Sequence, residues 1–433
     1  MAIIPQLKLF EWTEIQTLGD LKRLQLVLEA MPDEELMRAM EQRRGRGRND
    51  YPIRAMWNSV LAGIVFQHDG IEKLRRELVR NGQLRELCGF DNQVPPSWAY
   101  TRFLQALMKY EKLIESMFET LVDQIRQVLP DFGKHLAMDS KAIESFAAGK
   151  NKNETMDGRR DTDADYGKKE YRGVREDGTL WEKIVKWFGY KLHLVVDATY
   201  ELPVTFKVTK ASASDITEGH ALIEQMKQKQ PEMLEAAETL AADRGYDDTK
   251  MLVKLWDDHG IKPVIDIRNM WRDGEPTRLL NGRENVVYDF KGTVSCVCPE
   301  TGKKREMCNG GFEKDRNTLK KLCPAKQMGI TCAGAATCPV AQGIRIPLSE
   351  DRRIFTPIDR ASYKWEKAYN KRTSVERVNS RLDVSYGFEL HTIRGMSKMK
   401  LRCGLALCVM LAMALGRIKE KQAEKMRSLV SSA

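Results

Sequence analysis

The first third of the chain carries apolar residues three and four positions apart, which is the spacing of amphipathic helices. The pattern recurs over residues 21–31, 34–42, 53–67, 71–90 and 97–129. Ser97 follows two prolines, so it predicts a helix cap at the start of the last of these segments. The pattern predicts a compact helical bundle over residues 1–130.

From residue 135 the apolar runs become short and rich in Val, Leu and Ala, which indicates strands. We expect strands at 135–139, 189–200, 202–211, 239–243 and 261–268, with helices at 217–229 and 249–260. Between the first two strands lies a polar stretch of about forty residues with few large aliphatic side chains, and it predicts a long loop. Strands that alternate with helices in this way favour an α/β fold.

The last part of the chain interrupts this order and then resumes it. Residues 268–355 are rich in Gly and Cys and contain no long periodic helix, whereas residues 362–388 predict a charged helix. The apolar run 401–416 is shorter than the ~20 residues that cross a bilayer, and it contains Arg402, so we expect a buried helix.

The charge balance favours a polyanionic partner. Lys and Arg number 71 and Asp and Glu number 61, which gives a net charge of +10. The beginning of the chain lacks a basic leader followed by an apolar stretch, so we expect a cytoplasmic protein without a membrane span. No Gly-Lys pair is followed by Ser or Thr, which argues against a nucleotide cofactor.

Six of the nine cysteines crowd into residues 296–338. Such clustering in a reducing compartment predicts a thiolate metal site, and zinc is the usual occupant. Cys-Pro pairs at 323 and 338 resemble the corners of a zinc knuckle. The expected ligands are Cys308, Cys323, Cys332 and Cys338, with Cys298 as a competitor for the place of Cys308. The alternative is a set of free thiols.

Three carboxylates stand at informative positions. Asp139 and Asp243 each end a short predicted strand, and open α/β sheets place ligand sites at such strand ends. Glu376 lies on the later charged helix. Three acids brought together would repel one another, so the arrangement calls for divalent cations between them. Oxygen ligands favour two Mg²⁺ or Mn²⁺ ions, which can drive phosphoryl transfer.

These segments resemble the DDE transposases of bacterial insertion sequences. The resemblance rests on residues 135–143, 189–212, 240–248 and 369–382. It is strongest to the group whose third acid lies in a Tyr-x2-Arg-x3-Glu-x6-Lys signature, for which the chain supplies Tyr369, Arg372 and Glu376. Asp383 stands where that signature has Lys, which is a departure.

The resemblance implies an RNase H-like catalytic core interrupted by an insertion, with an N-terminal all-helical domain that binds the terminal inverted repeats of double-stranded DNA. It assigns the three acids to Asp139, Asp243 and Glu376, and a homodimer to the active complex. The implied domains are a helical DNA-binding domain at 1–130, a first core part at 131–267, a Cys-rich insertion at 268–355, and the core completion at 356–433.

Basic residues outside the acidic triad are the expected DNA contacts. They are Arg43, Arg44, Arg46 and Arg48, at the break after the second predicted helix, together with Tyr369, Arg372, Arg377 and Arg381. Two readings stay open at this point. The chain could be a nuclease of the same fold, or a catalytically impaired, transposase-derived DNA-binding protein, and the helical bundle could serve dimerisation instead of DNA binding.

Overall fold

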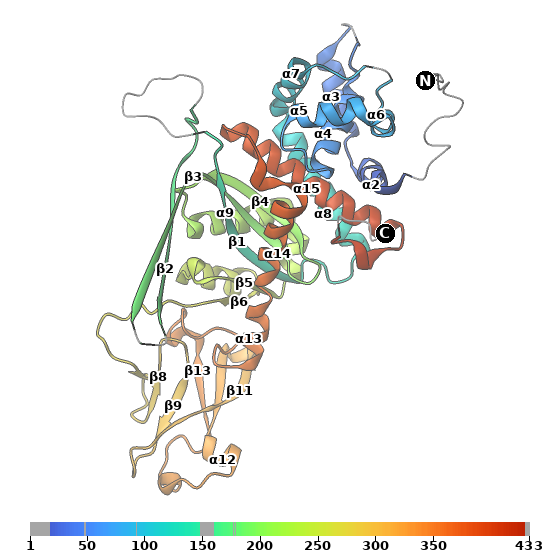
Figure 1. The fold of residues 1–433 in the computed structure, drawn as a ribbon. Helices are drawn as coiled ribbons and strands as arrows, with labels where there is room; N and C mark the ends of the chain where they lie inside the picture. The colour runs from blue at the N-terminus through green and yellow to red at the C-terminus, as the bar shows by residue number, and fades with distance from the viewer. Residues whose placement is uncertain are drawn as a thin grey trace, which may run out of the picture.

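The protein is elongated, with a helical region at one end, a large sheet in the middle and a β-rich unit at the other end (Figure 1). The structure is a computed structural model that describes residues 18–46, 49–91, 93–147, 160–175, 177 and 179–428. Of the expected DNA contacts, Arg48 therefore lies outside the described residues.

The large sheet is mixed, and its strand order fixes where the acids lie. Antiparallel strands β4, β3 and β1 are followed by β5 and β6, which run parallel to β1. The strands are β1 (His135–Glu144), β2 (Asp165–Val174), β3 (Leu180–Asp197), β4 (Leu202–Lys210), β5 (Thr239–Ala242) and β6 (Lys262–Ile265). The predicted strands of this part of the chain are all present.

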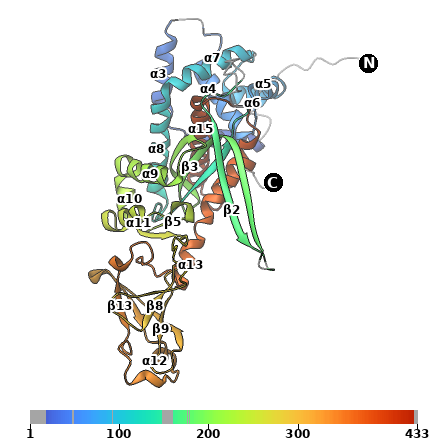
Figure 2. The ribbon, with the colours of Figure 1, turned by 90° about the vertical axis from the view of Figure 1, so that its left-hand side faces the viewer.

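The prediction of a long loop before residue 189 is wrong in part. Residues 165–174 form β2, which pairs with the first half of β3 and forms a ribbon that projects from the sheet (Figure 2). Most of β3 before Trp187 is exposed. A ribbon without a buried face needs no alternating apolar residues, so its hydrophobic pattern gave no signal.

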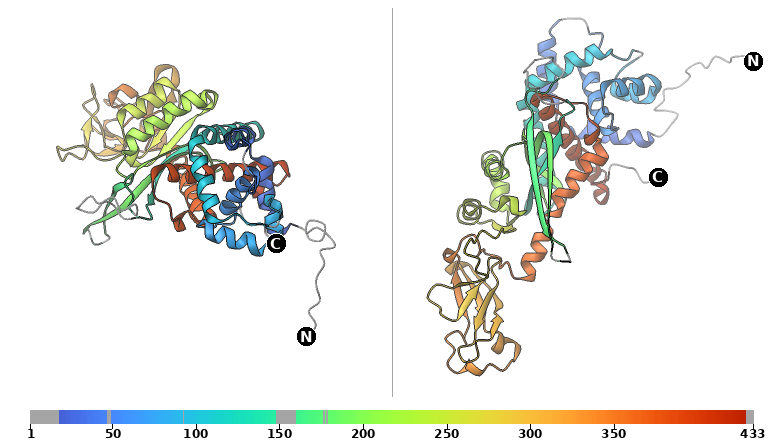
Figure 3. Two further views of the ribbon diagram at one scale, coloured as in Figure 1. Left: turned by 90° about the horizontal axis from the view of Figure 1, so that it is seen from above. Right: turned by 60° about the vertical axis from the view of Figure 1, so that its left-hand side comes forward.

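Helices cover both faces of the sheet (Figure 3). Helix α9 (Asp215–Lys229) packs on β3 and β4, whereas α14 (Thr373–Ser380) packs on β1 and β3 from the other side. The connections also contain α10 (Pro231–Ala236), α11 (Thr249–Val253) and α13 (Tyr363–Asn370). Helix α13 lies against β5 and β6 and leads directly toward α14.

The N-terminal helices share their core with the C-terminal helix α15 (Met396–Lys419). These helices are α2 (Lys22–Ala30), α3 (Glu34–Arg44), α4 (Ile53–Val65), α5 (Ile71–Arg80), α6 (Gly82–Cys88), α7 (Ser97–Leu107) and α8 (Glu111–Val128). Helix α15 is long and apolar enough to cross a membrane, but 83% of its apolar window is buried within the protein. It is a core helix, as expected for a helix that is hydrophobic on all sides.

The β-rich unit has its own hydrophobic core, formed by buried residues between Ile267 and Phe355. One sheet contains β7 (Arg278–Leu279), β8 (Val286–Tyr288), β9 (Val294–Val297) and β10 (Lys304–Glu306). A second contains β11 (Cys308–Glu313), β12 (Thr318–Leu322) and β13 (Ile344–Pro347), with α12 (Pro324–Met328) after β12. Helix α12 lies near the far end of the molecule (Figure 1).

Candidate active site

Asp139 and Asp243 lie on neighbouring parallel strands at the same level. The last registered pair of β1 and β5 is Met138 with Ala242, so an aspartate follows that pair on each side. Asp243 follows the end of β5 as predicted, but Asp139 lies inside β1, which continues to Glu144, and not at its end. Each carboxylate accepts a nearby backbone N–H: Asp139 from Ser140 at 2.7 Å, and Asp243 from Gly245 at 2.7 Å. The strand register and these local bonds hold the two acids side by side.

The pair is electrostatically unfavourable when both groups are ionised. Burial, and after it the charge of Asp243, raise the pKa of Asp139 from an ordinary value of 3.8 to about 6. Lys169 and Arg372 oppose this shift. Lys169 belongs to β2 and donates to the backbone oxygen of Ser140 at 3.3 Å. The site therefore holds negative charge that the protein only partly neutralises.

Glu376 lies on α14 and is engaged by an arginine. Its carboxylate accepts a bond from Arg372 at 2.7 Å, and 51% of its side chain is exposed. The Arg372 guanidinium lies 5.6 Å from the centre of the Tyr369 ring, and that ring stacks on Trp365 at 4.8 Å. The three signature residues thus form one contact group across the junction between α13 and α14.

Arg372 connects this group to the aspartates. The charge of Arg372 lowers the pKa of Asp139, and the charge of Asp243 raises the pKa of Tyr369. Among the described residues, no three His, Cys, Asp or Glu side chains form a ready-made metal-binding group. The structure therefore brings Asp139 and Asp243 together and holds the Glu376 carboxylate on Arg372.

The donor set fits a divalent cation. Two adjacent carboxylates with uncompensated charge are hard oxygen ligands of the kind that Mg²⁺ prefers. Glu376 could join them by releasing Arg372, because its side chain is half exposed and its helix packs on β1. Arg372 would then be free to bind a phosphate.

Asp383, the departure from the signature, has a specific partner. Its carboxylate accepts a bond from the ammonium of Lys141, and the two side chains are only 15% and 14% exposed. Lys141 lies two residues after Asp139 on β1, so both side chains belong to the same face of the sheet. Sequence reasoning missed Lys141, although its two-residue spacing from Asp139 was visible.

Arg377 and Arg381, two of the expected DNA contacts, have partners within the protein. Arg377 binds the buried carboxylate of Glu201 at 2.6 Å, and Arg381 donates to the backbone oxygen of the same residue. Arg427 also reaches Glu201, at 3.1 Å. Glu201 lies in the turn between β3 and β4, so these arginines fasten α14 and the C-terminal segment to the sheet.

The expected basic break lies at the end of α3. Arg43 and Arg46 are exposed, and Arg44 is half-buried and pairs with Glu41 at 2.7 Å. Gly45 ends the helix with a φ of +65°, which a residue with a side chain rarely adopts. This surface belongs to the helical end of the molecule, away from the β-rich unit (Figure 1).

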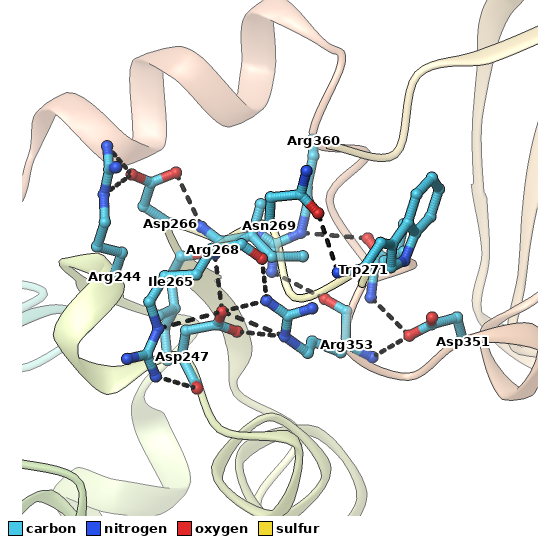
Figure 4. A network of polar contacts seen from close by, with 12 residues as sticks. Arg244, Asp247, Ile265, Asp266, Arg268, Asn269, Trp271, Asp351, Arg353 and Arg360 are labelled. Atoms are coloured by element: carbon cyan, nitrogen blue, oxygen red, sulfur yellow. Dashed lines mark hydrogen bonds and ion pairs between the residues drawn. The ribbon is translucent and has the colours of Figure 1, made fainter. Parts of the chain in front are cut away.

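A buried polar network fixes the loop that follows Asp243 (Figure 4). Asp247 is fully buried and binds Arg353 at 2.6 Å and the backbone N–H of Arg268 at 2.8 Å. Arg360 donates to the backbone oxygens of Ile354 and Arg353, each at 3.1 Å, and burial lowers its pKa to about 10. The network ties the segments after β5 and β6 to the segment that leads into α13.

The cysteines of the β-rich unit are all free thiols. Cys296, Cys298, Cys323, Cys332 and Cys338 line a cavity of about 310 Å³. Cys308 does not line this cavity. It pairs with Leu322 across β11 and β12, so the two side chains share one face of the sheet, and Cys323, the residue after Leu322, lies on the opposite face. The structure therefore favours Cys298 over Cys308 for the cysteine group.

The comparison with protein families identifies the class to which the chain belongs. The sequence profile described as a transposase DDE domain matches residues 130–412, and the chain belongs to this family of DDE transposases, which are enzymes acting on DNA. No curated protein matches the chain. A solved structure of a piggyBac transposase synaptic complex with hairpin DNA is similar at 9% identity and a TM-score of 0.36, covering 97% of this chain and 80% of that chain. The assignment rests on the family match.

We expect Asp139→Asn to stabilise the protein when divalent cations are removed by EDTA. Because folding raises the pKa of Asp139, the folded state binds the extra proton, and the wild type loses stability as pH rises from about 4 to about 6. The amide cannot ionise, so the variant should be more stable by roughly 2–3 kcal/mol at neutral pH. Urea unfolding across this pH range measures the effect. Equal stability at neutral pH would contradict a desolvated, like-charge site.

We expect Asp383→Lys to destabilise the protein, because Lys141 would lose its partner and face a like charge. The loss should approach the roughly 3–5 kcal/mol of a broken buried pair. Exchanging the charges in the double variant Lys141→Asp with Asp383→Lys should recover most of it. A double-mutant cycle in urea unfolding measures the coupling. Additive losses would show that the two side chains do not interact in solution.

Proposed function

We propose that the chain is the transposase of an insertion sequence, which binds terminal inverted repeats and catalyses metal-dependent strand cleavage and strand transfer. The single observation that carries the proposal is the register of β1 and β5, which juxtaposes Asp139 and Asp243 at the level where Arg372 approaches. Family membership supports the reaction class, because DDE transposases generally use divalent metal ions.

The catalytic core is proposed to be RNase H-like. Three antiparallel strands followed by two parallel strands, in the order β4-β3-β1-β5-β6, support this fold. The β-rich unit with its separate core is then an insertion between β6 and α13. The buried network around Asp247 and Arg353 holds both ends of the insertion beside the loop that follows Asp243.

The proposed roles follow from the chemistry of each side chain. Asp139, Asp243 and Glu376 would hold two Mg²⁺ or Mn²⁺ ions, which supply charge stabilisation and an activated oxygen nucleophile for in-line displacement. Arg372 is positioned to bind the phosphate at this site bidentately once Glu376 turns away from it. Tyr369 orients Arg372 through its ring. Lys169 adds positive charge on the β1 side of the site, whereas the charge of Lys141 is offset by Asp383.

The partner is proposed to be double-stranded DNA with terminal inverted repeats, bound in part through Arg43, Arg44 and Arg46. The active complex is proposed to be a homodimer, since an element has two ends to join. The proposed location is the bacterial cytoplasm, at the nucleoid. Neither a membrane nor a nucleotide cofactor has a part in this proposal.

We expect Asp139→Asn, Asp243→Asn and Glu376→Gln each to lower strand cleavage by more than about 100-fold, because each removes a ligand worth several kcal/mol of transition-state stabilisation. The substrate is a duplex carrying the inverted repeats that flank the gene, in Mg²⁺. Binding of the same duplex should stay within a few-fold of wild type. Cleavage and joining of a pre-cut 3′-hydroxyl end are measured separately.

Matched controls are available on neighbouring elements. Asp258→Asn and Glu366→Gln remove equal charges from exposed positions and should leave cleavage unchanged. Near-wild-type cleavage by any of the three active-site variants would remove that residue from the site. Cleavage without joining by the wild type would identify a nuclease, and binding without cleavage would identify a catalytically impaired DNA-binding protein.

We expect replacement of the three arginines Arg43, Arg44 and Arg46 by Gln to weaken DNA binding and flatten its salt dependence. Each lost phosphate contact makes the slope of log affinity against log salt less steep by about 0.9. The slope of the triple variant should therefore be less steep than that of the wild type by roughly 2–3. Fluorescence anisotropy at several salt concentrations measures both quantities.

The control removes the same charge from another exposed surface of the helical region. It replaces three residues of α5 by Gln, namely Lys73, Arg76 and Arg80. This variant should keep the wild-type slope. Equal losses in the two variants would mean that net charge, and not the break after α3, governs binding.

A further inference from the structure

Four cysteines of the β-rich unit each begin a tight turn. The residue after the cysteine is proline in three of the four cases, which favours a turn at that point. The bond that closes each turn ends on the backbone oxygen of the cysteine: Gly302 to Cys298 at 2.9 Å, Gln327 to Cys323 at 3.0 Å, Ala335 to Cys332 at 3.1 Å, and Ala341 to Cys338 at 3.2 Å. The bonds to Cys298 and Cys323 span four residues, and the second of them is in the first turn of α12, whereas the bonds to Cys332 and Cys338 span three. Each cysteine thus stands at the start of a turn.

The four turns converge on one cavity. Their cysteines line a space of about 310 Å³ between the strands β9 and β10, the start of α12 and the segment after α12. The thiols of Cys298 and Cys332 contact each other. Residues that are 40 positions apart in the sequence, from Cys298 to Cys338, are therefore gathered at one place.

The environment of the cavity favours thiolates. The Cys298 sulfur accepts bonds from the Thr301 side chain and from the backbone of Thr301, Gly334 and Glu300, as a thiolate does. Arg305 and two lysines, Lys303 and Lys326, also line the cavity. The Nη1 atom of Arg305 is buried and has no hydrogen-bond partner. These charges can offset the excess of four thiolates over the two charges of a zinc ion.

Apolar packing does not explain why the segment between Cys323 and Gly343, the tip of the β-rich unit, is folded. Between Cys323 and Gly343 the buried positions are Pro324, Gly334 and Val340, whereas Met328 and Ile330 are exposed. A segment with so little buried apolar area usually requires a covalent or metal cross-link. All nine cysteines are free, so a disulfide does not provide it.

We propose that Cys298, Cys323, Cys332 and Cys338 bind one structural Zn²⁺ ion at the tip of the β-rich unit. Zinc is favoured because tetrahedral tetrathiolate sites are its usual structural form in proteins. Binding replaces the protons of the thiols that are still protonated, and these protons pass to solvent. Cys296, which is half-buried on β9, borders the cavity without beginning a turn.

Metal binding would draw the sulfur atoms closer than they lie in this structure. Among the described residues no group of three potential ligands has the arrangement of a metal site, so the four turns would have to move together. Such movement couples the order of the tip to the metal. The inference is independent of the proposed DNA chemistry, because none of the four cysteines lies among the acids of the candidate active site.

The test is the zinc content of the full chain purified under reducing conditions without chelator. We expect about one equivalent of zinc. Each of the four single Cys→Ser variants should fall well below that content and unfold at a lower temperature, whereas Cys308→Ser and Cys296→Ser should keep both the zinc and the stability. Asp139→Asn should also keep its zinc although it loses cleavage activity. Zinc content therefore tests the zinc site independently of the proposed catalytic function.

A second measurement remains decisive if the serine variants fail to fold. Zinc in the wild type is exchanged for Co²⁺, and the visible spectrum should show tetrahedral d–d bands and the intense charge-transfer bands of thiolate ligands. Less than about half an equivalent of zinc in the wild type would overturn the proposal, since a structural site is normally filled. A loss of zinc on replacing Cys308 but not Cys298 would overturn the choice of ligands.

Discussion

The parallel pairing of β1 with β5 is the constraint on which the site depends. Because parallel strands are bonded at even spacing, one register places both aspartates at the same level, and a slip by one residue would turn one side chain to the other face. Buried apolar residues on both strands fix that register, since Leu136, Met138 and Leu240 are nearly inaccessible. The hydrophobic core thus enforces a contact between like charges that no pairwise attraction would produce.

The second constraint is the buried polar network around Asp247. Isolated charges are costly to bury, but Asp247 and Arg353 form an ion pair, and Arg360 donates to the backbone oxygens of Ile354 and Arg353. The network therefore holds the two ends of the β-rich unit, which lies between β6 and α13, at one place beside the large sheet. This placement determines where α13 begins, and hence where Arg372 meets the aspartates.

Much of the site was predictable from local patterns. The short apolar run before each aspartate is a local signal, and it correctly predicts that Asp243 follows directly on β5. The prediction that Asp139 ends its strand is wrong, because β1 continues to Glu144 through residues that pair with β3. The spacing of Tyr369, Arg372 and Glu376 predicts a shared face of one helix. The structure divides that helix into α13 and α14, with Arg372 between them, but the three side chains still form one contact group. The two-residue offset of Lys141 from Asp139 was equally local.

The helical spacing, the apolar runs that lead to Asp139 and Asp243, and the cysteine cluster are predictable from the sequence alone, because each depends on residues that are neighbours along the chain. Contacts between residues that are far apart in the sequence are set by the tertiary structure. The ion pair between Lys141 and Asp383 joins residues 242 positions apart. The preference for Cys298 over Cys308 follows from the pairing of β11 with β12. These long-range contacts depend on the strand register and on where the chain returns to the core. Both are set by the packing of apolar side chains that are far apart in the sequence, so no local pattern predicts them.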